Sequence, residues 1–211
     1  MIGKTLAILG SGHLGQQIAH YAIADHHYDN VVYFDDFTSD KLRDGFEILG
    51  NSSRIEQEFV NKSFDEMIIA LGYNHLTKKK EFFDRFIDVI PFGKIIHSSS
   101  WVDDSAIVGA GCVIYPRCAI DANVVIEKNT ILNIGCTIAH DTTIGGHCFL
   151  SPRVALAGFV KVENSCIIGI NATIIDNITI ASKAQIGGGA IVIKNITSAG
   201  LYVGNPCRFI R

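Results

Sequence analysis

The sequence lacks the features that mark several common functional classes. Its formal net charge is −3 over 211 residues, so it has no basic surplus of the kind that nucleic-acid binding requires. The apolar run within Met1 to Gly10 is too short for a signal peptide or a membrane span, and polar residues interrupt the later apolar stretches. We therefore expect a cytoplasmic protein that binds no nucleic acid and does not insert into a membrane.

The cysteine spacing of metal sites is missing as well. The chain contains six cysteines but no C-x-x-C pair. Five of them occupy positions where a repeat, described next, predicts a small inward side chain, and free cysteine behaves as a small buried hydrophobe. These five are Cys112, Cys118, Cys136, Cys148 and Cys166. We expect them to be core residues and expect no bound metal, while Cys207 lies outside the repeat and is left unassigned.

An aliphatic residue recurs at every sixth position from Val108 to Val192 without exception. The position two residues before each of these is mostly small or β-branched, and side chains two apart on a strand share a face. A strict period of six is typical of a parallel β-helix, in which each face is one short strand plus a corner. Three faces make a coil, so residues 105–194 predict five coils.

Residues 1–97 lack the repeat and show a different pattern. Apolar runs at Thr5–Leu9, Val31–Phe34 and Met67–Leu71 indicate buried strands, and the spacing of four apolar residues predicts an amphipathic helix over Lys79–Ile90. Strands alternating with helices predict a small Rossmann-like sheet. We therefore expect an α/β domain over residues 1–97, followed by an all-β domain, the parallel β-helix, over residues 98–211.

A glycine-rich turn, Gly10-Ser11-Gly12-His13-Leu14-Gly15, follows the first predicted strand. Such a turn lets the backbone approach a phosphate at the start of the next helix. The pair Asp35-Asp36 ends the second strand, where related folds hold a ribose hydroxyl. A nicotinamide dehydrogenase and a ligand-free turn are the alternatives, but about a hundred residues suit one mononucleotide half better than a full dinucleotide fold.

The arrangement of these two domains resembles the bacterial nucleotide-sugar acetyltransferases and the related sialic-acid O-acetyltransferases. The matching segments in the first domain are Gly10-Ser11-Gly12-His13, Phe34-Asp35-Asp36-Phe37 and Ala70-Leu71-Gly72-Tyr73-Asn74. Those in the second are Asn133-Ile134-Gly135, Ala139-His140-Asp141, Ile168-Gly169-Ile170-Asn171, Gly187-Gly188-Gly189-Ala190 and Val203-Gly204-Asn205-Pro206. The resemblance covers nearly the whole chain.

The resemblance implies a homotrimer of left-handed β-helices that transfers an acetyl group from acetyl-CoA to a nucleotide-linked 4-amino-4,6-dideoxy sugar, with UDP favoured over dTDP or GDP. It implies that His140 is the general base, with Asp141 as its acidic neighbour. The positions that match the nucleotide-sugar site are Ser11, Gly12, His13, Asp35, Asp36 and Gly72. Acetyl-CoA is expected between neighbouring β-helices, near Ile170 and Gly188.

One position departs from the family pattern. The family commonly has a second histidine nine residues after its base, and this chain has Phe149 there. Strand alternation predicts that His147 shares a face with Phe149. We expect the ring of Phe149 to pack along the pantetheine arm of the cofactor.

The residues around His140 agree with a role in acetyl transfer. His140 lies two positions after the inward Ile138 and two before the inward Thr142, so it falls on a corner and turns outward. Histidine titrates near neutral pH, which suits a base that deprotonates a sugar amine, and a carboxylate can orient the ring. Inward cysteines leave no covalent nucleophile, which favours direct transfer.

Two alternatives stay open from the sequence. One is an O-acetyltransferase on a sugar such as sialic acid, which would use the same base on a hydroxyl group. The other is a non-catalytic nucleotide-binding module whose β-helix serves only assembly. Ile134, Phe149 and Ile170 are apolar and predicted to face outward, so we expect them to be covered by a neighbouring subunit.

Overall fold

The computed structural model describes residues 3–211, so the first two residues of the expected N-terminal domain lie outside the described part. The chain divides into two compact units, residues 1–95 and residues 96–211, which we call the N-terminal and C-terminal units. None of the helices within residues 3–211 is long and apolar enough to span a bilayer.

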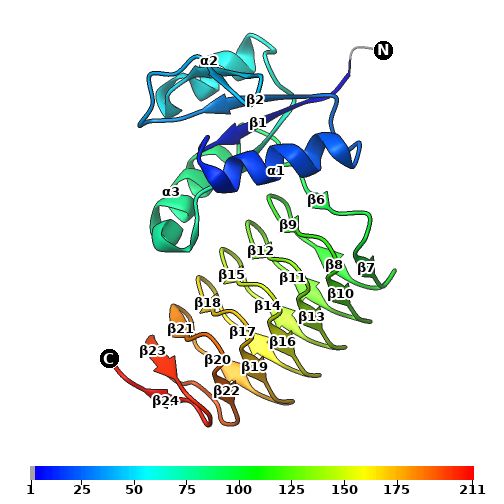
Figure 1. Cartoon of the computed structure of the whole chain (residues 1–211), viewed down its shortest axis with the longest axis vertical. Coiled ribbons are helices and arrows are strands. Elements are labelled where there is room, and N and C mark those ends of the chain that lie inside the picture. Colours follow the sequence, from blue (N-terminus) through cyan, green and yellow to red (C-terminus); the bar gives the residue numbers. More distant parts are fainter. Residues whose placement is uncertain (1–2) are drawn as a thin grey trace. The chain divides into compact units, whose positions relative to one another are not determined.

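The N-terminal unit is a twisted α/β sheet with helices α1 and α2 on opposite sides (Figure 1). Its elements are β1 (Thr5–Leu9), α1 (His13–Ala24), β2 (Asn30–Phe34), β3 (Leu42–Arg43), β4 (Phe46–Gly50), η1 (Ser52–Arg54), α2 (Ile55–Val60), β5 (Glu66–Ile69), η2 (Tyr73–His75) and α3 (Leu76–Phe86). The sheet order is β3-β4-β2-β1-β5. All neighbours are parallel except β3 and β4. This confirms the Rossmann-like prediction.

Helix α3 differs from the expected Lys79–Ile90, because it begins at Leu76 and ends at Phe86. Its apolar face is as predicted, with Phe83 and Phe86 fully buried. Elements β3, β4, η1 and α2 had no clear periodicity in the sequence and were not expected.

The glycine turn owes its composition to close packing between β1 and α1. A Cβ on Gly15 would lie 2.0 Å from the carbonyl oxygen of Gly10, so only glycine lets the helix sit this close to the strand end. Gly10 itself has φ +105°, a conformation that side chains disfavour. The turn therefore holds the N-terminus of α1 directly beside the carboxyl end of β1.

The C-terminal unit is a three-sided parallel β-helix whose coils stack along the unit (Figure 1). Equivalent residues lie 18 apart, as in the pairings of Ile120 with Ile138 and of Ile138 with Leu156. Strands β6–β22 are Ile95–Ile96, Trp101–Val102, Ile107–Val108, Val113–Ile114, Ala119–Ile120, Val125–Ile126, Ile131–Leu132, Thr137–Ile138, Thr143–Ile144, Phe149–Leu150, Ala155–Leu156, Lys161–Val162, Ile167–Ile168, Thr173–Ile174, Thr179–Ile180, Ala184–Ile186 and Ile191–Val192. The predicted β-helix is confirmed.

The three sheets of the β-helix run β22-β19-β16-β13-β10-β7, β20-β17-β14-β11-β8 and β24-β23-β21-β18-β15-β12-β9-β6. The third sheet continues past β21 with β23 (Gly200–Val203). Strand β24 (Arg208–Phe209) forms its edge and is antiparallel to β23. The inward rows form one continuous core, in which the five repeat cysteines are at most 2% exposed. This confirms that these cysteines are core residues.

Every coil turns its corners through a left-handed residue. Each sixth residue from Gly111 to Gly189 has φ between 56° and 75°. The corner pattern was not predicted, although the asparagines, aspartate and glycines among these residues are types that tolerate that region. It fixes the geometry of the candidate base, because His140 comes immediately before the left-handed residue Asp141, whose φ is 56°.

Candidate functional site

The N-terminal unit has a pocket of about 360 Å³ at the carboxyl ends of its central strands. Loops that follow β2, β1 and β5 line it, and these strands are adjacent in that order. Strand β2 lies on one side of β1 and strand β5 on the other, so the strand order reverses at β1. Open α/β sheets bind ligands at this switch point, where the pocket lies. The lining residues are Leu9, Gly10, Gly12, His13, Leu14, Asp35, Asp36, Phe37, Ala70, Leu71, Gly72, His75, Lys78 and Phe82.

Five of the six predicted nucleotide-sugar residues line this pocket, and the sixth, Ser11, supports one of them. Ser11 is 2% exposed. Its hydroxyl and its backbone N–H both donate to Oδ2 of Asp35, each at 2.7 Å. Ser11 therefore positions the carboxylate of Asp35 and does not itself line the pocket.

The two aspartates at the end of β2 are held in different ways. Burial alone would raise the pKa of Asp35, but hydrogen bonds from Ser11 and from the N–H of Phe37 outweigh it and lower the pKa. Asp36 accepts hydrogen bonds from the N–H and the hydroxyl of Ser52, at 2.7 and 3.0 Å. A carboxylate has about four acceptor positions, so both groups retain capacity for a ligand hydroxyl or N–H.

Two histidines and a lysine line the pocket beyond the aspartates. His13 opens α1, whose N-cap Gly12 offers no side-chain cap, so the first N–H groups of the helix are left for a ligand. Beyond β5, His75 and Lys78 also line the pocket. The side chain of Lys78 is 58% exposed and also contacts Glu81 at 3.1 Å.

The two predicted glycines of the pocket are open toward it. A Cβ built on Gly12 or on Gly72 would meet no atom within 4 Å. Packing against neighbouring atoms therefore does not require glycine at these two positions. Their backbone is accessible to a ligand, as in a phosphate-binding turn.

His140 projects from a corner of the β-helix together with Asp141. The imidazole is 49% exposed and its Nδ1 lies 2.9 Å from Oδ2 of Asp141. The other oxygen of Asp141 accepts a hydrogen bond of 3.1 Å from the amide of Asn123. The bonds from His140 and then from Asn123 lower the pKa of Asp141, so the carboxylate stays ionised at neutral pH and fixes the orientation of the ring.

Three residues around His140 were not predicted. Phe159 packs edge-on against the imidazole, with ring centroids 5.1 Å apart and planes at 87°. A Cβ on Gly158 would lie 2.8 Å from Cε1 and 2.9 Å from Nε2 of His140, so glycine leaves the space that the ring needs. Asn123, Gly158 and Phe159 each lie 18 residues, one coil, from Asp141 or His140. The six-residue repeat could have indicated them, because residues 18 apart occupy the same corner of adjacent coils.

Two of the residues expected at the cofactor, Ile170 and Gly188, lie together on one corner of the β-helix. Ile170 is 49% exposed, and a Cβ on Gly188, one coil later, would lie 3.1 Å from its Cγ2. The two therefore occupy the same corner of adjacent coils. That corner joins β18 to β19, whereas the corner of His140 joins β13 to β14. One chain thus presents its candidate base and its candidate cofactor residues on different edges of the prism.

Phe149 and His147 do not lie as predicted. Phe149 is 5% exposed, so its ring is already covered within the chain and the expectation that a neighbouring subunit covers it is wrong. Its contact with the cofactor stays a prediction. His147 has φ 62° and lies on a corner, so strand alternation does not relate it to Phe149. It is 3% exposed, and its Nδ1 lies 2.9 Å from the amide nitrogen of Asn129. The exposed histidine of this part of the chain is His140.

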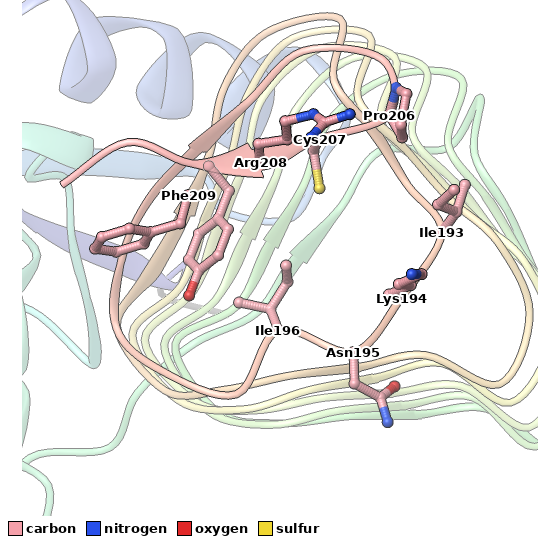
Figure 2. A pocket seen from close by; sticks show the side chains of 9 residues that line it. Ile193, Lys194, Asn195, Ile196, Pro206, Cys207, Arg208 and Phe209 are labelled. Atoms are coloured by element: carbon pink, nitrogen blue, oxygen red, sulfur yellow. The ribbon is translucent and has the colours of Figure 1, made fainter.

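A second cavity, of about 310 Å³, lies at the end of the β-helix near the C-terminus (Figure 2). Ile196 and Lys194 lie on the last coil, Cys207 lies in the turn before β24, and Arg208 lies on β24. Burial raises the pKa of the Cys207 thiol, which makes it a poor nucleophile at neutral pH. No predicted site residue lines this cavity, and among residues 3–211 no three His, Cys, Asp or Glu side chains gather as a metal-ligand set.

Comparisons with known proteins agree with both units. Residues 5–85 match the family model of the PglD N-terminal domain. The acetyltransferase domain of PglB from Neisseria gonorrhoeae FA1090 is 25% identical, with a TM-score of 0.90 over 98% of this chain and 100% of that one. PerB from Caulobacter crescentus, solved with CoA and GDP-perosamine, is 25% identical, with a TM-score of 0.88 over 100% and 99%.

A third structure, WeeI from Acinetobacter baumannii AYE, shares the fold at 22% identity, with a TM-score of 0.85 over 98% of this chain and 100% of that one. The resemblance inferred from the sequence is thereby confirmed.

Proposed function

We propose that this chain, whose residues 5–85 belong to the PglD N-terminal domain family, is an acetyl-CoA-dependent N-acetyltransferase that acts on a nucleotide-linked amino sugar. The observation that carries the proposal is the exposed His140–Asp141 pair on a β-helix corner, with its ring seated over Gly158. One similar structure is the acetyltransferase domain of PglB, and another is PerB in complex with CoA and GDP-perosamine, which supports both the reaction and the substrate class. We place the acetylated amine at the 4-position of a 4,6-dideoxy sugar.

The chemistry that we assign to His140 is general-base catalysis. With Nδ1 directed at Asp141, Nε2 is the nitrogen that accepts a proton from the sugar amine as that amine attacks the thioester carbonyl. The new C–N bond forms, the C–S bond breaks, and the proton passes from His140 to the departing thiolate. The ionised Asp141 stabilises the imidazolium between these steps.

The pocket of the N-terminal unit suits the nucleotide part of such a substrate. Its volume of about 360 Å³ is near the lower end for small-ligand sites, which fits one nucleotide better than a dinucleotide. Carboxylates at the end of β2 can accept bonds from ribose or base, and the N-terminus of α1 can receive the diphosphate. UDP is the nucleotide that we favour, with dTDP or GDP as alternatives.

A homotrimer would complete the active site. His140 and the pair of Ile170 and Gly188 lie on different edges of the β-helix, so a neighbouring copy is needed to bring both kinds of residue to one thioester. Ile134 and Ile170 are 42% and 49% exposed and occupy equivalent corners two coils apart. Such an apolar edge gains stability from burial against a second subunit. We therefore propose that acetyl-CoA lies between neighbouring β-helices.

The test is a mass-spectrometric transfer assay with acetyl-CoA and a panel of UDP-, dTDP- and GDP-linked 4-amino-4,6-dideoxy sugars, each matched by its 4-hydroxy analogue. We expect one acetyl group to be added to an amino sugar, in an alkali-stable amide linkage. An alkali-labile product on the hydroxy analogue would favour O-acetylation instead. Tight NAD binding without acetyl transfer or affinity for any nucleoside diphosphate would contradict the proposal.

A further inference from the structure

We propose that Phe37 is the base-recognition residue of the nucleotide pocket, stacking its ring on the nucleobase of a nucleoside diphosphate. The inference rests on the proposed function and adds a specificity-determining residue to it. Phe37 is 98% exposed, yet it lines the pocket immediately after the aspartate pair. A phenylalanine ring that is this open to water gains most when a flat apolar ligand covers it.

The backbone that carries Phe37 is fixed although its ring is free. The N–H of Phe37 donates to Oδ1 of Asp35 at 2.9 Å, and Oδ2 of the same carboxylate is held by Ser11 at 2.7 Å. Asp36, the residue between Asp35 and Phe37, accepts a hydrogen bond from the N–H of Ser52. The ring is thus attached to an anchored segment at the edge of the pocket, which lowers the entropy lost when a ligand packs against it.

The charge distribution of the pocket decides which part of the ligand meets Phe37. Across the sheet edge the order is β2, β1, β5, with Asp35 and Asp36 after β2, the N-terminus of α1 after β1, and His75 and Lys78 after β5. The diphosphate is attracted to α1 and Lys78 and is repelled by the two carboxylates. The nucleoside is left at the β2 end, where the carboxylates accept its hydroxyl or N–H groups and Phe37 meets its base.

Calorimetry on the full-length protein tests this inference with UDP, dTDP, GDP, inorganic pyrophosphate and acetyl-CoA as ligands. Stacking of a base on an aromatic side chain predicts that Phe37→Ala raises the Kd of the nucleoside diphosphates by about 5- to 150-fold. The Kd values for pyrophosphate and acetyl-CoA should stay unchanged, because neither interaction involves the ring. In Phe37→Trp, affinity should return and the nucleotide should quench the new indole fluorescence.

A matched control is Leu42→Ala, which removes another large apolar side chain, 62% exposed, that does not line this pocket. It should bind all five ligands like the wild type. The inference would be overturned if Phe37→Ala bound nucleoside diphosphates as tightly as the wild type, or weakened acetyl-CoA binding or oligomer formation instead. If the wild-type protein bound none of the three nucleotides, both the proposed function and the role of Phe37 would be wrong. If the wild type bound them and Phe37→Ala bound them equally well, only the role of Phe37 would be wrong.

Discussion

Replacing Gly158 with alanine should disable acetyl transfer while the fold stays intact. The added Cβ would lie 2.8 Å from Cε1 and 2.9 Å from Nε2 of His140, and ordinary contact begins at 3.4 Å. The ring must therefore move by about 0.6 Å. It cannot do so without disturbing its hydrogen bond to Asp141 or its edge-on contact with Phe159. The displaced nitrogen is the one that we assign as the proton acceptor.

The size of the effect follows from the displacement. A misplacement of about 1 Å at a reacting group costs about a hundredfold in rate, so we expect kcat to fall by roughly 10- to 100-fold. The backbone of Gly158 is not in the left-handed region, and the side chain that must yield is exposed. The free energy of unfolding should therefore change by less than about 1 kcal/mol.

The assay is steady-state acetyl transfer at saturating acetyl-CoA and nucleotide sugar, with urea unfolding on the same preparation. Asp176→Ala is the matched control, because it changes the equivalent corner position one coil beyond Gly158 and leaves His140 untouched. The control should keep full activity. If Gly158→Ala turned over at about the wild-type rate, or if the control lost as much activity, a restrained His140 could not be the base.

Four further predictions follow from the two units. Asp36→Ala should raise the KM for the nucleotide sugar several-fold and leave that for acetyl-CoA unchanged, measured by initial rates; an equal change in both would contradict a nucleotide role. Lys78→Ala should weaken binding of UDP and of pyrophosphate alike and reduce the salt dependence of both, measured by calorimetry; selective loss of UDP would oppose a phosphate contact. Ile170→Asp should shift the mass measured by light scattering toward the monomer and abolish transfer together; an active monomer would exclude a shared site. Ser11→Ala should lower the unfolding free energy by about 1 kcal/mol at pH 7, because one hydrogen bond to Asp35 is lost. The folded-state pKa of Asp35 is lowered, so this difference should be complete above the unfolded pKa of about 4 and should vanish as pH falls through the folded value; a difference that persisted at lower pH would have another cause.

The β-helix could be predicted residue by residue because its core imposes a period that no other element shares. Inward residues such as Ile138 and Leu156 recur at six-residue intervals and pair with the next coil after three faces. The N-terminal strands were predictable for a simpler reason, since β1 and β2 are short apolar runs buried on both faces. Strand β4 and helix α2 escaped because their periodicity is weak and tertiary packing decides their conformation.

The candidate site could be predicted only where residues are close in sequence. His140 and Asp141 are neighbours, and their hydrogen bond follows from the corner that they share. The burial of Phe149 could not be predicted, because the sequence shows which way a side chain faces but not what covers it. His147 failed because a left-handed corner interrupts strand alternation just before β15. Gly158 was not predicted because the ring for which it leaves space, that of His140, is 18 residues away in the sequence.

The central claim is that His140 removes the proton from a sugar amine during transfer from acetyl-CoA. The most direct measurement compares the wild type with His140→Ala in single-turnover transfer of isotopically labelled acetyl groups, with the Kd of both substrates measured on the same samples. We predict a loss of transfer rate of at least about a hundredfold with both Kd values unchanged. Near-full transfer by His140→Ala, together with a loss in His147→Ala, would contradict the account.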